Sequence, residues 1–251
     1  MPKTEIKYKL VKKIALLIPA YNEEKHIDKV IKNCAIYHMD IIVVDDGSID
    51  KTNDIIKRIK ASGQYQLIIL KHKKNQGKGA ALQTGFKYII EKKYKGVITL
   101  DADAQHETLE INDFLTQIRK EQPDLIIGSR LQNHQGMPRI RFLTNLFTSW
   151  TISLFAGKRI DDTQSGFRYI SSHLLKNIEL RTKNFDTESE IILKAAWLGL
   201  KIKNIPISTI YHPDAVSKVN PFIDAFKFFK LISKSLVWRR KIKKQRFNLF
   251  Q

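Results

Sequence analysis

The chain has 251 residues, of which 43 % are hydrophobic, so it can fill the core of one large domain. This composition argues against an intrinsically disordered chain. Its 44 lysines and arginines against 25 acidic residues give a formal net charge of +19, which favours a polyanionic partner such as anionic lipid or nucleic acid. The single cysteine, Cys34, excludes an intrachain disulfide and fits a reducing compartment.

The first half of the chain alternates short apolar runs with segments of helical periodicity. Strands are expected at Ile14–Pro19, Ile41–Asp45, Leu67–Leu70, Val97–Asp101 and Asp124–Gly128. Helices are expected between them at Glu23–Tyr37, Asp50–Ala61, Ala80–Lys92 and Thr108–Glu121. Short strands separated by longer helices favour βαβ units and an α/β fold with a mostly parallel sheet. Runs that are apolar on both faces favour helices on both sides of that sheet.

After Arg130 the alternation loosens. The expected elements are an uncharged buried or interfacial helix, a turn plus strand, a helix and a last strand, at Phe142–Ala156, 161–171, Phe185–Leu198 and Lys201–Ile210. From Pro221 onward the apolar residues recur every three or four positions with lysines between them, which is typical of an amphipathic interfacial helix. We therefore expect a main domain over 1–220 and a basic helical tail over 221–251 that associates with a membrane surface.

Two further features bear on the compartment. No segment offers the roughly 20 uninterrupted apolar residues of a membrane span, and the run IALLIPAY is too short for a signal peptide. Between Ala225 and Gln251 there are nine lysines and arginines and no acid, which suits an anionic membrane surface. We expect a cytoplasmic protein that lies peripherally on the cytoplasmic face of a membrane; a solvated lysine-rich surface is the alternative reading of the charge.

Four polar clusters follow expected strands: PAYNEE, DDGS, DADAQ and GSR. In parallel sheets ligands bind beyond the carboxyl ends of the strands. In DADAQ, residues two apart in an extended segment point the same way, so Asp101, Asp103 and Gln105 can present oxygens to one hard cation, Mg²⁺ or Mn²⁺. Such a cation suits a diphosphate ligand, whose charge it neutralises.

Two other clusters can contact the same ligand. Asp45 and Asp46 can accept hydrogen bonds from a base or ribose; the alternative is that Asp46, Ser48 or Asp50 caps the following helix. The loop NQGKGAALQTG places Lys78 and backbone N–H groups at a helix start, a plausible anion site. His106 and His212 are expected to pack or lie on the surface.

Together PAYNEE, VVDDGSID, NQGKGAALQTG, LDADAQH, GSR and DTQSGFRYI resemble the family 2 glycosyltransferases of the GT-A fold, and among them the polyprenyl-phosphate sugar transferases such as dolichyl-phosphate mannose synthase. The resemblance runs from about Ile14 to Pro221. It implies that Pro19, Tyr21 and Glu23, with Asp45 or Asp46, hold the nucleoside of a sugar donor, and that Asp101, Asp103 and Gln105 form the metal and diphosphate site. It also implies that Arg130 and Arg141 bind the acceptor phosphate and that Lys218, after Ser217, lies in a lid over the donor diphosphate.

The implied activity is a metal-dependent, inverting transfer of a sugar from GDP-mannose or a UDP-sugar to a polyprenyl phosphate, dolichyl or undecaprenyl. Arg130, Arg139, Arg141 and Arg168 follow the acid pair and can hold that phosphate. The nucleotide and the sugar stay open, and a separate membrane-anchored partner is a further candidate. If the acceptor is instead a hydroxyl of a growing glycan, a carboxylate base is required, and Asp186, Glu188 or Glu190 can supply it.

Rival classes explain less of the chain. A phosphatase of the haloacid dehalogenase type also places an acid pair after a strand, but Gln105 stands where that chemistry uses threonine or valine. A non-catalytic nucleic-acid or membrane-binding protein would explain the charge but not DDGS and DADAQ, and no nucleic-acid recognition module is present in the sequence. No nucleic-acid partner is expected.

Overall fold

The computed structural model describes residues 13–131, 137–184, 186–210, 232–235, 237–239 and 242. Its strands are β1 Ile14–Ala20, β2 Ile41–Asp45, β3 Leu67–Lys71, β4 Gly96–Thr99, β5 Leu125–Ser129, β6 Arg168–Ser171 and β7 Ile202–Pro206. Its helices are α2 Ile27–Ala35, α3 Thr52–Ala61, α4 Lys78–Glu91, the short 3₁₀ helix η1 Thr108–Glu110, α5 Ile111–Glu121, α6 Arg139–Ala156, α7 Ser172–Asn177 and α8 Asp186–Trp197.

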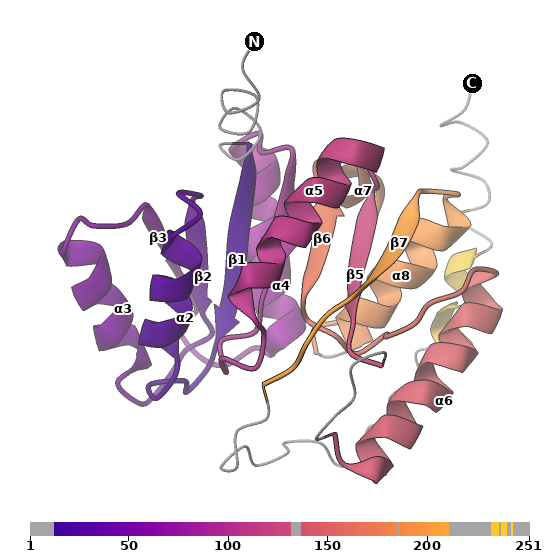
Figure 1. The fold of residues 1–251 in the computed structure, drawn as a ribbon, viewed down its shortest axis with the longest axis horizontal. Helices are drawn as coiled ribbons and strands as arrows, with labels where there is room; N and C mark the ends of the chain where they lie inside the picture. Colours follow the sequence, from indigo (N-terminus) through magenta and orange to yellow (C-terminus); the bar gives the residue numbers. More distant parts are fainter. Residues whose placement is uncertain are drawn as a thin grey trace.

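All seven strands form one sheet in the order β3-β2-β1-β4-β6-β5-β7 (Figure 1). β1 pairs in parallel with β2 and β4, β2 with β3, and β5 with β7. β6 is antiparallel to both of its neighbours, β4 and β5. The expected mostly parallel sheet is confirmed, and its one antiparallel strand lies between two strands that are adjacent along the chain in the βα series.

Helices cover both faces of the sheet, as the doubly apolar strands predict. Alternate residues of β1 divide between two cores: Ala15 and Leu17 pack with α4, α6, α7 and α8, whereas Leu16 and Ile18 pack with α2, α3 and α5. This split follows from the two-residue period of a strand. The resulting three layers are visible in Figure 1.

The expected element positions are largely confirmed, with shifted ends. The strand expected over Val97–Asp101 ends at Thr99, so that both acids of the pair lie in the loop after it. α6 begins at Arg139, earlier than the expected Phe142. α7 was not expected from the sequence.

The described part of the C-terminal tail packs on the main domain. Trp238 is only 6 % exposed and, with Ile242, belongs to the core beside α8, where Lys194 lies over the Trp238 ring at 4.8 Å. A lysine ammonium over an indole is a favourable cation–π contact. The Trp238 ring is therefore buried in protein, while the membrane association expected of the basic tail stays a prediction. Most of 221–251 lies outside the described residues.

Candidate functional site

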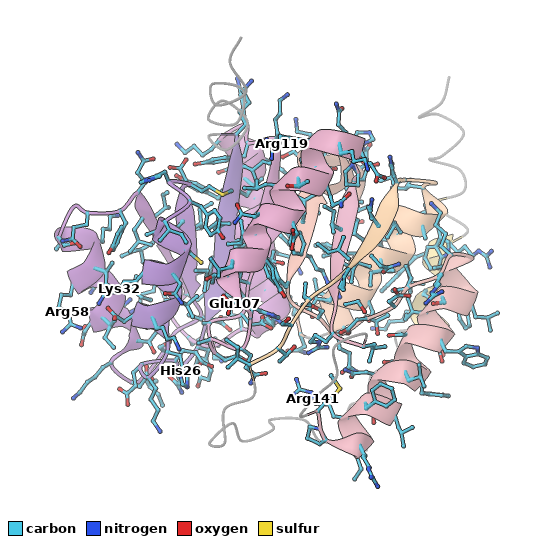
Figure 2. All side chains as sticks on the ribbon, in the orientation of Figure 1. His26, Lys32, Arg58, Glu107, Arg119 and Arg141 are labelled. Atoms are coloured by element: carbon cyan, nitrogen blue, oxygen red, sulfur yellow. The ribbon has the colours of Figure 1, made fainter. Side chains whose placement is uncertain are left out.

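The four polar clusters lie at one edge of the sheet. β1, β2 and β4 run in parallel, and β5 runs the same way because both β4 and β5 are antiparallel to β6. Figure 2 shows His26 and Glu107 at this carboxyl edge, and Arg141 at the lower end of α6 on the same side, whereas Arg119 lies at the opposite edge. The prediction that the clusters share one edge is confirmed.

The loops after β1 and β2 are joined by reciprocal hydrogen bonds. The Asn22 N–H donates to Ser48 Oγ at 3.1 Å, and the Ile49 N–H donates back to Asn22 Oδ1 at 3.0 Å. The Glu23 N–H donates to Thr52 Oγ1 at 2.8 Å. These bonds fix the PAYNEE and DDGS loops against each other, so that they form one rigid rim of the site.

The residues expected at the nucleoside differ in accessibility. Pro19 is buried in β1, while Tyr21 and Glu23 are half-buried on the rim. Asp45 and Asp46 are both buried. Only the rim residues therefore present side-chain surface in this state; the nucleoside role of all five stays a prediction.

Asp45 and Asp46 are held by hydrogen bonds within the protein. Asp45 accepts from the Ser48 N–H at 2.9 Å and from Asn53 Nδ2 at 2.8 Å. Asp46 Oδ1 lies 2.6 Å from His72 Nδ1, and Asp46 also accepts from the backbone N–H groups of Gln76 and Gly77, at 2.9 and 2.8 Å. The second carboxylate thus ties the loop that carries Lys78 to the end of β2.

Asp101 is in contact with a lysine ammonium group and a histidine ring. Its Oδ1 lies 2.6 Å from Lys78 Nζ, and its Oδ2 lies 3.3 Å from His106 Nε2. Lys78 Nζ is also 2.7 Å from Glu188 Oε1 on α8. Burial disfavours both charges, but the neighbouring opposite charges outweigh it, so that the pKa of Lys78 is raised and the pKa of Asp101 is lowered. Lys78, expected at an anion site, therefore lies between two carboxylates.

Asp103 and Gln105 complete the turn after β4. Asp103 Oδ1 accepts from the Gln105 N–H at 3.1 Å, and Ala104 between them has φ 57°, a left-handed conformation uncommon for a residue with a Cβ. In the described part of the chain, no three histidine, cysteine or acidic side chains gather in a metal-binding group. Mg²⁺ commonly uses one or two protein carboxylates and takes further oxygens from bound phosphates. The carboxylates present therefore fit a cation that binds together with a diphosphate, and Asp101, Asp103 and Gln105 stay its predicted ligands.

Two of the four predicted arginines are enclosed in the protein. Arg130 is 5 % exposed, and its guanidinium forms a bidentate pair with Asp162. Arg168 is buried and donates to the carbonyls of Ser165, Glu188 and Thr163, each at 2.7 Å. Arg168 is therefore a structural residue that joins β6 to α8. The acceptor-phosphate role of Arg130 stays a prediction.

The other two arginines open α6. Arg139 is exposed and Arg141 is half-buried. The helix carries an exposed apolar stripe, from 48 % exposure for Leu146 to 74 % for Ile140, which comprises Ile140, Leu143, Leu146, Phe147, Trp150 and Leu154. The opposite side of α6, with Asn145, Thr148, Ser149 and Ile152, is buried. The sequence did not distinguish groove lining from core packing for the apolar residues of this helix; the structure exposes most of them.

The candidate bases on α8 have different surroundings. Glu190 is buried in an ion pair with Lys194 and accepts from the backbone of Arg181 and Thr182, so its role is structural. Glu188 is buried beside Lys78. Asp186 is half-buried in the first turn and accepts from the Asn184 N–H at 3.3 Å. The base role of Asp186 and Glu188 stays a prediction; Ser217 and Lys218, the predicted lid, lie outside the described residues.

Two residues of the site make contacts that the sequence analysis did not predict. His106 is buried with Nε2 on Asp101; its position directly after DADAQ was a signal, but a motif does not reveal a ring orientation. Asp162 reaches Arg130 from 32 residues away along the chain, and nothing in the local sequence indicates that pairing.

Comparison with known proteins agrees with this geometry. The sequence model of the family described as Glycosyl transferase family 2 matches residues 15–177. An uncharacterised protein of Methanocaldococcus jannaschii is 36 % identical over 230 residues, covering 89 % of this chain and 92 % of that protein. A protein of Methanococcus voltae named UDP-N-acetylglucosamine--dolichyl-phosphate N-acetylglucosaminyltransferase is 34 % identical over 235 residues, covering 87 % and 94 %.

The fold is also found among solved structures. The crystal structure of S. aureus TarS 1-349 in complex with UDP-GlcNAc superposes with a TM-score of 0.63 at 18 % sequence identity and covers 94 % of this chain and 72 % of that chain. At this identity the likeness concerns the fold, and it confirms the GT-A arrangement expected from the motifs.

Proposed function

The chain belongs to glycosyl transferase family 2, among the polyprenyl-phosphate sugar transferases, and from that premise we propose that it transfers a sugar from a nucleotide-sugar donor to a polyprenyl phosphate with inversion at the anomeric carbon. The observation that carries the acceptor class is α6. Its exposed apolar stripe begins beside Arg139 and Arg141, at the same edge of the sheet as the acid pair. A lipid phosphate needs this combination: cationic groups for its head and an apolar surface for its chain.

In the proposed reaction an oxygen of the lipid phosphate attacks the anomeric carbon. The new bond joins that carbon to the phosphate oxygen, and the bond to the donor diphosphate breaks, so that the nucleoside diphosphate leaves with the electron pair. Because the attacking oxygen is already anionic near neutral pH, no side chain has to remove a proton. Mg²⁺ or Mn²⁺ at Asp103 and Gln105, with Asp101, would neutralise charge on the leaving diphosphate.

The protein's own contribution is to hold two anions close together against their repulsion. The rim of Tyr21 and Glu23 is rigidly attached to the DDGS loop and would orient the nucleoside. Arg141, half-buried in the first turn of α6, would hold the acceptor phosphate, and Arg130, which is fixed by Asp162, is the second predicted phosphate ligand. The proposed donors are GDP-mannose or a UDP-sugar; the Methanococcus voltae relative is named for UDP-N-acetylglucosamine.

We further propose that the protein works at the cytoplasmic face of a membrane. None of the helices in the described ranges is both long and apolar enough to cross a membrane. Arg139 and Arg141 lie at the start of the stripe on α6, Lys158 and Arg159 follow its end, and α6 contains no acidic residue. Cations at both ends of an apolar face complement anionic headgroups.

The test is a phase-partition assay with radiolabelled GDP- and UDP-sugars, Mn²⁺ or Mg²⁺, and two acceptors supplied separately, a polyprenyl phosphate and a soluble oligosaccharide. Label that enters the organic phase only with the polyprenyl phosphate supports the proposal and identifies the sugar. The variant Arg141→Ala should raise the KM for the lipid, while Arg119→Ala, at the opposite edge of the sheet, should not.

A hydroxyl acceptor is the competing activity, and α8 provides its test. Transfer to the oligosaccharide that is lost in Asp186→Asn would establish a glycan hydroxyl as acceptor with Asp186 as base. Under the proposed reaction Asp186→Asn keeps its rate of transfer to polyprenyl phosphate. The measurement is the initial rate with each acceptor at saturating donor.

A further inference from the structure

The ammonium group of Lys78 lies between two carboxylates that come from distant parts of the chain. Asp101 follows β4 and Glu188 lies in the first turn of α8, and the two are 2.6 and 2.7 Å from Lys78 Nζ. The Lys78 side chain is 17 % exposed and that of Glu188 5 %. A largely enclosed lysine that bridges two carboxylates neutralises them at short range, where the effective dielectric is lower than in water.

The position of Lys78 is set by close packing of α4 on the segment before α8. The Ala80 N–H donates to the Lys183 carbonyl at 3.0 Å. A Cβ at Gly79 would collide with Thr187 and with the backbone of Lys183, so the glycine permits this close approach. The start of α4 therefore cannot retreat from α8 without losing this contact, and the ammonium group is held at the acid pair.

Both oxygens of Asp101 are occupied by side chains, since His106 Nε2 lies 3.3 Å from Oδ2. Asp103, by contrast, is half-buried and accepts a hydrogen bond from a backbone N–H in its own turn. The two acids of the pair thus have different surroundings: Asp101 contacts Lys78 and His106, whereas Asp103 accepts from the backbone of its own turn.

We propose that Lys78 is a resident cation of the acid site, which neutralises Asp101 and Glu188 and so delays binding of a divalent metal until a donor diphosphate arrives. The inference rests on the proposed metal-assisted transfer. In the donor-free protein the ammonium satisfies the carboxylate charge that would otherwise attract a metal. The diphosphate restores the missing negative charge, and the metal then binds beside Asp103 together with it. Lys78 is thus a positioning residue, since it acts on the metal through the carboxylates of Asp101 and Glu188.

The proposal predicts that removing Lys78 raises the affinity for a divalent cation, whereas a purely structural lysine would leave that affinity unchanged or lower it. Replacing Lys78 by methionine keeps most of the side-chain volume but leaves Asp101 and Glu188 without the cation that lies between them. Two carboxylates that face the vacated ammonium position should hold a divalent cation in the absence of any nucleotide, since such a cation needs only one or two protein carboxylates and completes its coordination with water. A lysine that only stabilised the fold, or that only contacted the donor diphosphate, would not make metal binding tighter when removed.

The experiment is a titration of the full chain with Mn²⁺ without nucleotide, in which free Mn²⁺ is measured by its paramagnetic resonance signal. Lys78→Met should bind Mn²⁺ at least about tenfold tighter than the wild type, as expected for loss of a neighbouring like charge. Lys78→Arg retains the cation and should restore wild-type affinity. Lys74→Met, which removes an exposed lysine of the same loop, should match the wild type.

An unchanged or weaker Mn²⁺ affinity in Lys78→Met would overturn the proposal. If that variant does not fold, the same test uses Glu188→Gln and the double variant Lys78→Met/Glu188→Gln. The double variant should bind Mn²⁺ more tightly than Glu188→Gln alone. Equal affinities of these two variants would refute the proposal. Adding UDP or GDP separates this inference from the proposed function. Wild-type protein without nucleotide-dependent Mn²⁺ binding would remove the metal from the proposed reaction, whatever the Lys78 variants do.

Discussion

Arg130 and Asp162 form a buried bidentate ion pair, with Nε 2.7 Å from Oδ2 and Nη2 2.9 Å from Oδ1. Asp162 also accepts from the backbone N–H groups of Arg130, Gln164 and Ser165. The pair attaches the loop that returns from α6 to the end of β5, at the edge where the candidate site lies. The relative position of α6 and the acid pair therefore depends on it.

Asp162→Ala should lower the free energy of unfolding by about 3–5 kcal/mol, because it leaves a buried guanidinium without its counterion. Asp161→Ala is the matched control: Asp161 pairs with Arg159, whose side chain is 87 % exposed, and its loss should cost no more than about 1 kcal/mol. Chemical denaturation of the two variants measures the difference. Equal losses would show that the buried pair does not stabilise the fold.

The stability difference between the wild type and Asp162→Ala should depend on pH in a definite direction. Burial alone would raise the pKa of Asp162, but Arg130 and the backbone donors outweigh it and lower the pKa below its ordinary value of 3.8. A depressed folded pKa contributes stability that is present above the unfolded pKa and is lost as the pH falls through the folded pKa. The stability difference between the wild type and Asp162→Ala should therefore be full at pH 6 and decrease below about pH 4. A difference that grows on acidification contradicts this assignment.

Asp103→Asn should reduce metal-dependent sugar transfer by about a hundredfold, because it removes a carboxylate that would share the metal with the donor diphosphate. The fold should be unaffected, since asparagine can still accept the hydrogen bond from the Gln105 N–H. Asp113→Asn, an exposed acid on α5, is the control. The measurement is the initial rate of each variant over a range of Mn²⁺ concentrations, together with its thermal midpoint. A wild-type rate in Asp103→Asn at every Mn²⁺ concentration would exclude Asp103 as a metal ligand.

Replacing Leu143 and Trp150 by glutamate should reduce co-sedimentation with anionic phospholipid vesicles about tenfold, because both charges lie on the exposed stripe of α6. Ile36→Glu is the matched control, since Ile36 is an exposed apolar residue at the end of α2, away from α6. Its binding should equal that of the wild type. If all three proteins bind alike, α6 is not the membrane-facing surface.

Cys34 should resist alkylation in the folded protein. It is buried on α2, and burial raises the pKa of its thiol to about 12, so almost no thiolate is present at pH 8. Because the raised pKa keeps the folded form protonated, stability is complete below the unfolded value of 9.0 and decreases as the pH rises towards 12. Iodoacetamide labelling followed by mass spectrometry, with and without denaturant, measures the alkylation rate of Cys34. Rapid labelling of the native protein would contradict its burial.

The sequence by itself determined the strands and helices of the first half of the chain and the edge at which the chemistry lies. Strands such as Ile41–Asp45 are continuous apolar runs bounded by turn residues, so their type and position follow from local composition. The polar residues of PAYNEE, DDGS, DADAQ and GSR follow such runs, and parallel pairing then brings them to one edge. Both are properties of short segments, which a sequence records directly.

Tertiary structure alone decided which groups within that edge are paired and which are exposed. Nothing near Asp101 indicates that Lys78 and Glu188 meet there, because the contact depends on how α4 and α8 pack against the same face of the sheet. Likewise the insertion of β6 between β4 and β5, the pairing of Arg130 with Asp162, and the exposed face of α6 depend on long-range packing. Side-chain burial and charge pairing are properties of the assembled layers, and local patterns do not specify them.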